Sequence, residues 1–153
     1  MSDTITMKIE IPADNDGFAL LQCSLCGELF KVKPSDYEDD GVLEIHCPAC
    51  GLSGENFFTE EVIELALAMA QNYAHDLIYS QMKKWEKQLS NGIMTFKAGK
   101  KPKPEYESPI HATIDALTIT RFRCCGYDTK IKPLLKICGS YCPFCGVKEF
   151  ELE

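Results

Sequence analysis

The chain has 153 residues, of which 45% are hydrophobic and 25% charged, a composition that excludes collagen-like and extensively disordered proteins. No apolar stretch approaches the roughly 20 residues that cross a bilayer. The chain also starts without the basic region and apolar core of a secretory signal, so we expect a cytoplasmic protein with no membrane contact. The net charge of −7 disfavours a phosphate backbone as the main partner.

Cysteine is the most informative residue type, because the chain contains nine of them. An odd number argues against a framework of fully paired disulfides, and a cytosolic compartment keeps thiols reduced. Clustered thiols in such a protein are more often metal ligands. Their spacing is therefore the main guide to function.

Residues 1–58 contain a predicted N-terminal strand and the first group of cysteines. Residues 5–11 alternate apolar and polar side chains, which is typical of a β-strand. Two C-x2-C-G turns follow, with their cysteines at Cys23, Cys26, Cys47 and Cys50. Each turn points both sulfur atoms to one side, while its glycine takes the positive φ that the turn requires. Two such turns predict a closed site of four thiolates for Zn²⁺, with iron as the residual metal.

A hairpin is predicted between these two turns. Residues 29–33 and 42–46 alternate partly as strands, and the acidic stretch 34–41 supplies the turn between them. His46 precedes a ligand directly. With four cysteines present, we interpret it as a strand residue or as a hydrogen-bond donor to the ligands.

Residues 59–91 form the one long predicted helix. Thr59 is its expected N-cap, acidic residues occupy its first turn, and Gly92 follows its end. Apolar residues, including Trp85, form a broad stripe along it. The stripe is either an intramolecular core or a face for a partner or a second copy, since two small ribbons have little apolar surface with which to cover so long a helix.

Residues 92–109 are predicted to be a linker, because they are rich in Gly, Pro and Lys and show no periodicity. Four lysines in this segment offer a contact for nucleic acid: Lys97, Lys100, Lys101 and Lys103. Without interleaved aromatic residues they are a weak signal, and a solvated tether is the more frequent explanation.

Residues 110–153 contain a second version of the N-terminal cysteine pattern. Residues 26–34 align without a gap with residues 125–133, and residues 45–51 align with residues 140–146. The chain is therefore predicted to contain one module twice, each copy forming a zinc ribbon.

The alignment leaves the fourth ligand of the second site open. It matches three cysteines to ligands of the first site, namely Cys125, Cys142 and Cys145. Phe122 stands where Cys23 would be. Cys124 is the favoured replacement because it lies in the same turn. The rival, Cys138, would lie roughly 13 Å from the next turn along an extended strand; His111 is a more distant choice, and an empty site is the remaining alternative.

The expected fold is α+β, with two small zinc-ribbon β-hairpin modules joined by one long amphipathic α-helix. The cysteine turns resemble the knuckles of the zinc-ribbon or rubredoxin-like superfamily over residues 18–52 and 118–150. The resemblance implies a metal-bound hairpin and no single activity, because such ribbons serve in transcription machinery, nuclease subunits and multiprotein assemblies, both as nucleic-acid contacts and as protein docking modules.

The preferred functional interpretation is a non-enzymatic zinc-binding adaptor or accessory subunit that docks onto a larger protein complex. Closed sites, acidic charge and scattered histidines favour it, and no P-loop, G-x-S-x-G or H-E-x-x-H pattern occurs in the sequence. The first alternative is a nucleic-acid-binding subunit that uses the four lysines. The second is electron transfer of the rubredoxin type.

Overall fold

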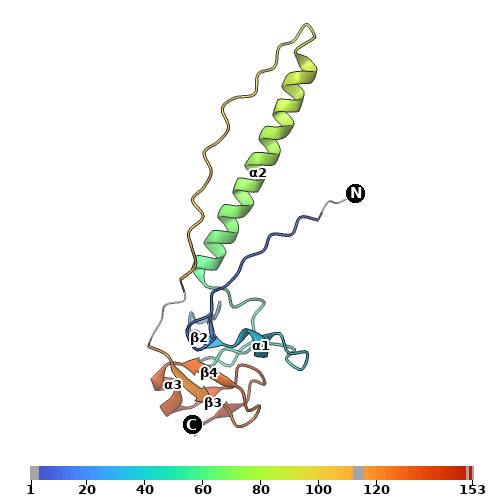
Figure 1. The fold of residues 1–153 in the computed structure, drawn as a ribbon. Coiled ribbons are helices and arrows are strands. Elements are labelled where there is room, and N and C mark those ends of the chain that lie inside the picture. The colour runs from blue at the N-terminus through green and yellow to red at the C-terminus, as the bar shows by residue number, and fades with distance from the viewer. Residues whose placement is uncertain (1–3, 112–115, 151, 153) are drawn as a thin grey trace. The chain divides into compact units, whose positions relative to one another are not determined.

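The computed structural model describes residues 4–111, 116–150 and 152 (Figure 1). They form a mixed α and β fold with two small antiparallel sheets and one long helix. In chain order, the elements are β1 (Ala19–Gln22), β2 (Leu29–Val32), α1 (Pro34–Tyr37), α2 (Glu60–Leu89), β3 (Thr118–Arg121), β4 (Asp128–Ile131), α3 (Pro133–Cys138), β5 (Ser140–Tyr141) and β6 (Lys148–Glu149).

The chain divides into two compact units. The first comprises Met1–Val62 and Ile110–Glu153 and therefore contains both cysteine segments. The second comprises Ile63–Pro109, which is most of α2 and the chain that follows it. Each unit is described separately below.

The four-stranded sheet of the first unit joins strands from both cysteine segments, in the order β1-β2-β4-β3. One cysteine turn connects β1 to β2, and another connects β3 to β4. At the centre, β2 and β4 pair antiparallel with Lys31 opposite Lys130. These two lysines are aligned in the sequence, so matching residues of the two segments face each other.

The prediction that residues 29–33 pair with residues 42–46 as a hairpin is wrong. Leu29–Val32 pairs with β1 and β4 instead. The turn at residues 23–28 joins β1 directly to β2, whereas residues 33–41 contain α1 and an acidic loop. The shorter connection brings its strands together at the lower entropy cost.

The strand predicted over residues 5–11 is also wrong. Within the described part of the chain, this segment has no strand partner, and residues 4–8 are exposed. The carboxylate of Asp14 accepts the amide N–H groups of Asp16 and Phe18, which turns the chain sharply after a single bridge between Ala13 and Ala19. Alternation of apolar and polar residues does not by itself provide a neighbouring strand with which the segment could pair.

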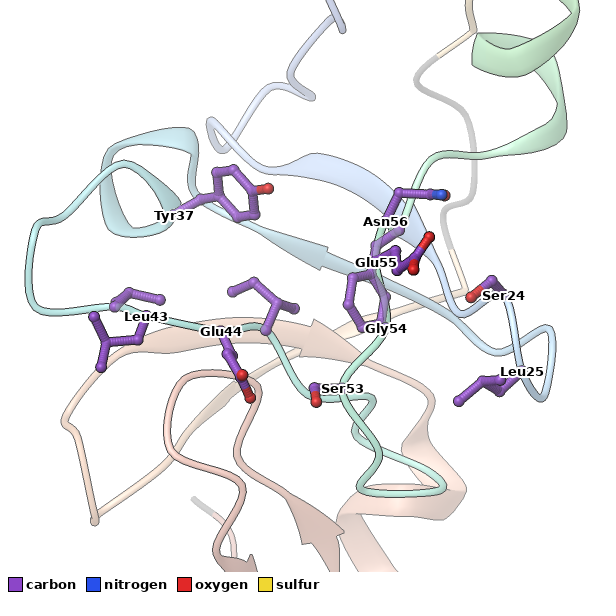
Figure 2. A pocket seen from close by; sticks show the side chains of 12 residues that line it. Ser24, Leu25, Tyr37, Leu43, Glu44, Ser53, Gly54, Glu55 and Asn56 are labelled. Carbon is purple, nitrogen blue, oxygen red and sulfur yellow. The ribbon is translucent and has the colours of Figure 1, made fainter.

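A gap separates residues 42–45 from residues 53–57 in the N-terminal segment (Figure 2). The two stretches meet at one bridge between His46 and Ser53 and line a cavity of about 930 Å³. In the C-terminal segment, the aligned stretches pair with each other as β5 and β6. The two segments therefore differ in the pairing of these stretches.

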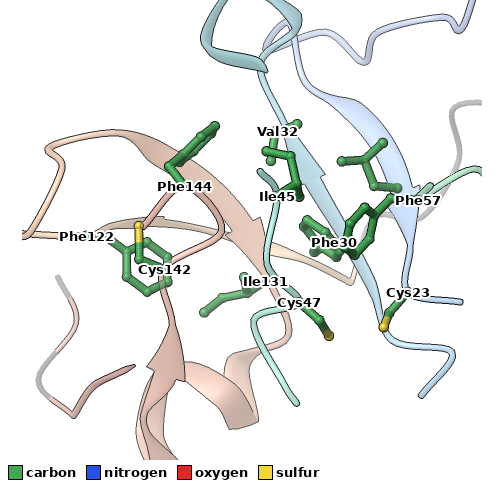
Figure 3. Packing of buried hydrophobic residues seen from close by; sticks show 11 residues of the cluster. Cys23, Phe30, Val32, Ile45, Cys47, Phe57, Phe122, Ile131, Cys142 and Phe144 are labelled. Atoms are coloured by element: carbon green, nitrogen blue, oxygen red, sulfur yellow. The ribbon is translucent and has the colours of Figure 1, made fainter. Parts of the chain in front are cut away.

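A core of buried side chains from both cysteine segments lies beside the sheet (Figure 3). Phe30 and Phe122 are fully buried, and the ring of Phe30 meets that of Phe57 edge-on at 5.8 Å between centroids. Cys47 and Cys142 are fully buried members of the same cluster. The sulfur atoms are thus attached directly to the core that holds the two segments together.

Two buried lysines meet one aspartate near the centre of the sheet. Lys31 is only 2% exposed, and its Nζ lies 2.9 Å from Oδ2 of Asp14. The Nζ of Lys130 lies 2.8 Å from the same oxygen. Burial acts to raise the pKa of the Asp14 carboxyl, but hydrogen bonds from Lys130, from the Phe18 N–H and from Lys31 hold the pKa well below its usual range. Lys130 also pairs with Oδ2 of Asp16 at 2.6 Å, so the two carboxylates together compensate the two ammonium charges where the segments join.

Helix α2 carries an exposed apolar row. Only Val62 among the residues of this helix is buried. Apolar side chains recur at close to the 3.6-residue helical period along one exposed face, at Ile63, Leu67, Ala70, Ala74, Leu77, Trp85 and Leu89. Most of this face is available for contact with other molecules.

Part of the predicted linker lies along α2 instead of extending freely into solvent. The side chain of Asn72 donates to the carbonyl of Glu105 at 3.0 Å and accepts the N–H of the same residue at 2.7 Å. Lys101 pairs with Asp76 at 2.7 Å. These contacts fasten the extended chain to the helix within the second unit.

The packing between the two cysteine segments yields a stability prediction. Gly51 has φ of +73°, and a Cβ there would lie 2.7 Å from the Tyr141 ring of the other segment. Gly27 has a similar φ of +77° but open space around the added carbon. Both Gly→Ala changes strain the backbone, and only G51A also crowds the neighbouring segment. We expect G51A to lower the free energy of unfolding by about 1–3 kcal/mol more than G27A, as measured by urea denaturation of the zinc-loaded protein. Equal losses would contradict close packing between the segments.

Candidate metal centre

Four knuckle turns share the same backbone hydrogen bonds. In each, the N–H of the first residue donates to the carbonyl five residues on, and a glycine N–H donates back to the first carbonyl. The first residues are Cys23, Cys47, Phe122 and Cys142. The four glycines have φ between 71° and 77°, a region in which a side chain is strained. The turn geometry is therefore retained even where phenylalanine replaces cysteine.

The first cluster brings together the four cysteines that the sequence predicts: Cys23, Cys26, Cys47 and Cys50. The sulfur atoms of Cys23 and Cys50 are 3.8 Å apart, and those of Cys26 and Cys47 are 3.5 Å apart. All four sulfurs lie within 4.8 Å of one another. Cys23 and Cys47 are buried, so half of the cluster is shielded from solvent.

The second cluster contains the vicinal pair and two cysteines of the last knuckle: Cys124, Cys125, Cys142 and Cys145. The sulfur atoms of Cys124 and Cys145 are 3.2 Å apart. Cys138 is exposed at the end of α3 and is not part of the cluster. His111 lies elsewhere, where its backbone N–H donates to the carboxylate of Glu61 at 2.9 Å. Of the candidates for the fourth position, the structure brings Cys124 to the other three.

Glu149 explains how this knuckle works without its first cysteine. In the knuckle that begins at Cys23, the sulfur of that residue accepts backbone N–H groups of the turn. Phe122 has no such acceptor and points into the core, where it is fully buried. The carboxylate of Glu149 instead accepts the N–H groups of Arg123 at 3.1 Å and of Cys124 at 2.7 Å. Glu149 is therefore a positioning residue for the Cys124 side of the cluster.

Sequence reasoning did not identify Glu149, although a signal was present. Glu149 aligns with Gly54 of the first segment, where an added Cβ would lie 3.3 Å from the hydroxyl oxygen of Ser24. A side chain thus appears in the second segment where the first has none. The knuckle that has Phe122 at its first position is thus also the one with a carboxylate at the position of Glu149.

Reciprocal contacts hold the knuckles of the two segments together. The N–H of His46 donates to the carbonyl of Pro143 at 2.7 Å, and the N–H of Tyr141 donates to the carbonyl of Pro48 at 3.0 Å. His46 aligns with Tyr141, and Pro48 aligns with Pro143. The ring of His46 also lies beside Gly146, just as the ring of Tyr141 lies beside Gly51. His46 is therefore a packing residue at the junction and does not belong to the sulfur cluster.

The thiols in each cluster shift one another's pKa values. Burial acts to raise the pKa of Cys23, but the N–H groups of Cys26 and Leu25 donate to its sulfur and bring the pKa below the ordinary thiol value. Burial and the thiol of Cys145 raise the pKa of Cys125 to about 12. Burial, Cys145 and Glu149 raise the pKa of Cys124 as well. Sulfur atoms this close ionise together only when a cation lies among them.

The donor set fits a thiophilic divalent metal. With Zn–S bonds of about 2.3 Å, the sulfur atoms of a tetrahedral site lie about 3.8 Å apart. The pair distance of 3.8 Å in the first cluster agrees with this value, and that of 3.2 Å in the second needs only a small expansion. Four sulfur ligands complete a tetrahedral coordination shell, which is the pattern of structural zinc sites. The two clusters thus suggest zinc binding.

Comparison of the chain with protein-family models, with curated proteins and with solved structures gives no match. In the part of the chain that the structure describes, no helix combines the length and apolar character needed to cross a membrane. The chemistry of the clusters and of the exposed surfaces therefore has to indicate what the protein does.

Metal stoichiometry tests the assignment of Cys124. We expect wild type and C138S to bind two Zn²⁺ per chain, because Cys138 lies outside the cluster. C124S replaces a thiolate with a hydroxyl that seldom ligates zinc, so we expect it to keep one Zn²⁺ firmly and to lose the other to a moderate chelator. Native mass spectrometry with elemental analysis gives the counts. Loss of one zinc from C138S, with two retained in C124S, would reverse the assignment.

Proposed function

We propose that the protein is a non-enzymatic, zinc-stabilised adaptor or accessory subunit that docks onto a larger protein complex. In this proposal, the eight clustered cysteines ligate two structural Zn²⁺ ions, and the two cysteine segments are copies of one module. The observation that carries it is the pair of four-sulfur clusters attached to a shared core. Four thiolates leave no position at zinc for a substrate.

The need for metal follows from the small size of the core. Each cysteine segment contributes only a few buried apolar side chains, and the main sheet has four short strands. Domains with so little apolar burial usually require metals or disulfides for independent stability. Zinc supplies this stabilisation when bound, because its four ligands fix two knuckles relative to each other.

The exposed row on α2 supports a docking role. Large apolar side chains on this helix remain 44% to 58% exposed, as at Ile63, Leu67, Leu77, Ile78, Trp85 and Leu89. A continuous apolar face of this length is typical of an interaction surface. A second copy of the chain is one candidate for its occupant, and another protein is the other.

The nucleic-acid alternative receives less support from the contacts. Lys101, one of the four lysines proposed for phosphate binding, already pairs with Asp76. The remaining lysines stand in an extended segment and have no aromatic side chains between them. Steep loss of oligonucleotide binding with rising salt, abolished by replacing these lysines, would favour this alternative.

Metal removal tests the structural role of zinc. We expect chelation to abolish the cooperative thermal unfolding of the cysteine segments, because structural zinc contributes about 10 kcal/mol or more to folding. The second site should lose its metal first, since only Cys142 of its four cysteines is buried. Circular dichroism with parallel zinc analysis follows both events, and Mg²⁺ serves as the control for restoration by Zn²⁺. An unchanged melting temperature after full zinc removal would contradict the proposal, and a coloured, iron-containing protein would favour electron transfer.

Charge insertion on α2 tests docking. We expect L67E/L77E to abolish the co-purification of a specific partner, or to convert a dimer to a monomer, because two carboxylates would be placed on the exposed apolar row. The matched control is E64Q/E86Q, which changes charge on the same helix outside that row. Tagged proteins purified from the source organism are compared by mass spectrometry. Identical partners and subunit number for wild type and L67E/L77E would contradict docking through this face.

A further inference from the structure

The gap in the N-terminal segment lies between two irregular stretches that leave backbone groups unpaired (Figure 2). Its walls are residues 42–45 and residues 53–57, which separate beyond the bridge between His46 and Ser53. The backbone N–H groups of Leu43, Glu44 and Ile45 donate to none of the described residues. Unpaired N–H groups along an extended stretch are ready to pair with an added strand.

The C-terminal segment shows what closes the same place. There, Gly139 and Phe150 align with Glu44 and Glu55. A Cβ on Gly139 would lie only 2.9 Å from the Phe150 ring and 3.1 Å from the carbonyl of Glu149. The stretch that contains Gly139 and the stretch that contains Phe150 are therefore in close contact. The N-terminal segment replaces the glycine and the phenylalanine with two carboxylates. Side chains of like charge on opposite walls oppose closure of the gap.

The two carboxylates that line the gap have no partner in the part of the chain that the structure describes. Neither Glu44 nor Glu55 forms an ion pair or a side-chain hydrogen bond with any described residue. The surrounding segment is strongly acidic, with 11 acidic and three basic residues in positions 1–58. The charge of the gap is therefore complementary to a lysine or arginine side chain.

Apolar side chains complete the lining. Leu43 is 91% exposed and Leu25 is 61% exposed, although both face the cavity. A second cavity of about 320 Å³ shares Tyr37 and Phe57 with the first, and most of its lining is apolar. The groove therefore offers apolar contacts on either side of its acidic centre.

We propose that this groove binds an extended peptide segment of a protein partner, which adds as a strand along residues 42–45. A lysine or arginine of that segment meets the carboxylates of Glu44 and Glu55, and apolar side chains at the adjacent positions contact Leu43. This spacing follows from the alternation of a strand, in which neighbouring residues such as Leu43 and Glu44 face opposite sides. The inference rests on the proposed docking function and specifies the chemistry of its partner.

Selection from a random peptide library tests the groove even while the natural partner is unidentified. Zinc-loaded wild type is the target for a displayed library of eight-residue peptides, and E44Q/E55Q is used for counter-selection. We expect enriched peptides to contain lysine or arginine with apolar residues at the adjacent positions. Their dissociation constants, from fluorescence anisotropy, should rise at least about tenfold in E44Q/E55Q.

Two further variants sharpen the test. E44G/E55F introduces the residues of the closed C-terminal segment and should also weaken binding at least about tenfold. E10Q/E64Q removes the same charge at exposed sites outside the groove and should change binding less than about twofold. Amide resonances of residues 43–45 should shift on peptide addition, which a purely non-specific charge effect would not produce.

Several results would overturn the proposal. They are the absence of enriched peptides, equal binding by wild type and E44Q/E55Q, or resonance shifts confined to other parts of the chain. A peptide-free dimer that E44Q/E55Q dissociates would assign the groove to a second copy instead. If zinc is bound and the fold is intact but no peptide binds, this inference fails alone. If no metal is bound, the proposed function fails whatever the peptides do.

Discussion

The antiparallel pairing of β2 with β4 is the contact on which the rest of the first unit depends. It places Lys31 opposite Lys130 and joins two short hairpins into one sheet. Two buried ammonium groups at this junction would be costly, and the carboxylates of Asp14 and Asp16 compensate them. The reciprocal knuckle contacts then form a second line of attachment. The buried cluster contains side chains from both cysteine segments, so the junction and the core form together.

The knuckles show that backbone geometry and ligand identity vary separately. The turn at Phe122 keeps the hydrogen bonds and the glycine conformation of the other three, although its first side chain is apolar. The sulfur of Cys124 takes the fourth position of the cluster, and Glu149 of β6 accepts the N–H groups of Arg123 and Cys124. The carboxylate thus holds the backbone at the vicinal cysteine pair.

The sequence predicts the local features better than the pairings. Three C-x2-C turns and the long helix follow from spacing, because each depends on residues close together in the chain, and nearness in the chain also made Cys124 the favoured fourth member of the second cluster. The partners of Leu29–Val32 and the unpaired state of residues 5–11 do not follow, because alternation shows that a stretch can be a strand without showing its neighbour. Asp14 reaches Lys130 across 116 residues of sequence and Glu149 reaches Cys124 across 25, and only the folded chain brings them to these donors.

The two aligned segments differ at the place where the N-terminal segment has its groove. The C-terminal segment closes its β5–β6 pair with Gly139 against Phe150, which leaves no space between the strands. The N-terminal segment has glutamates at both positions and remains open. Unpaired backbone N–H groups risk non-specific pairing with other chains, and charged side chains beside them are a known protection against this. The same two carboxylates therefore keep the groove open, repel unsuitable strands and select a basic one.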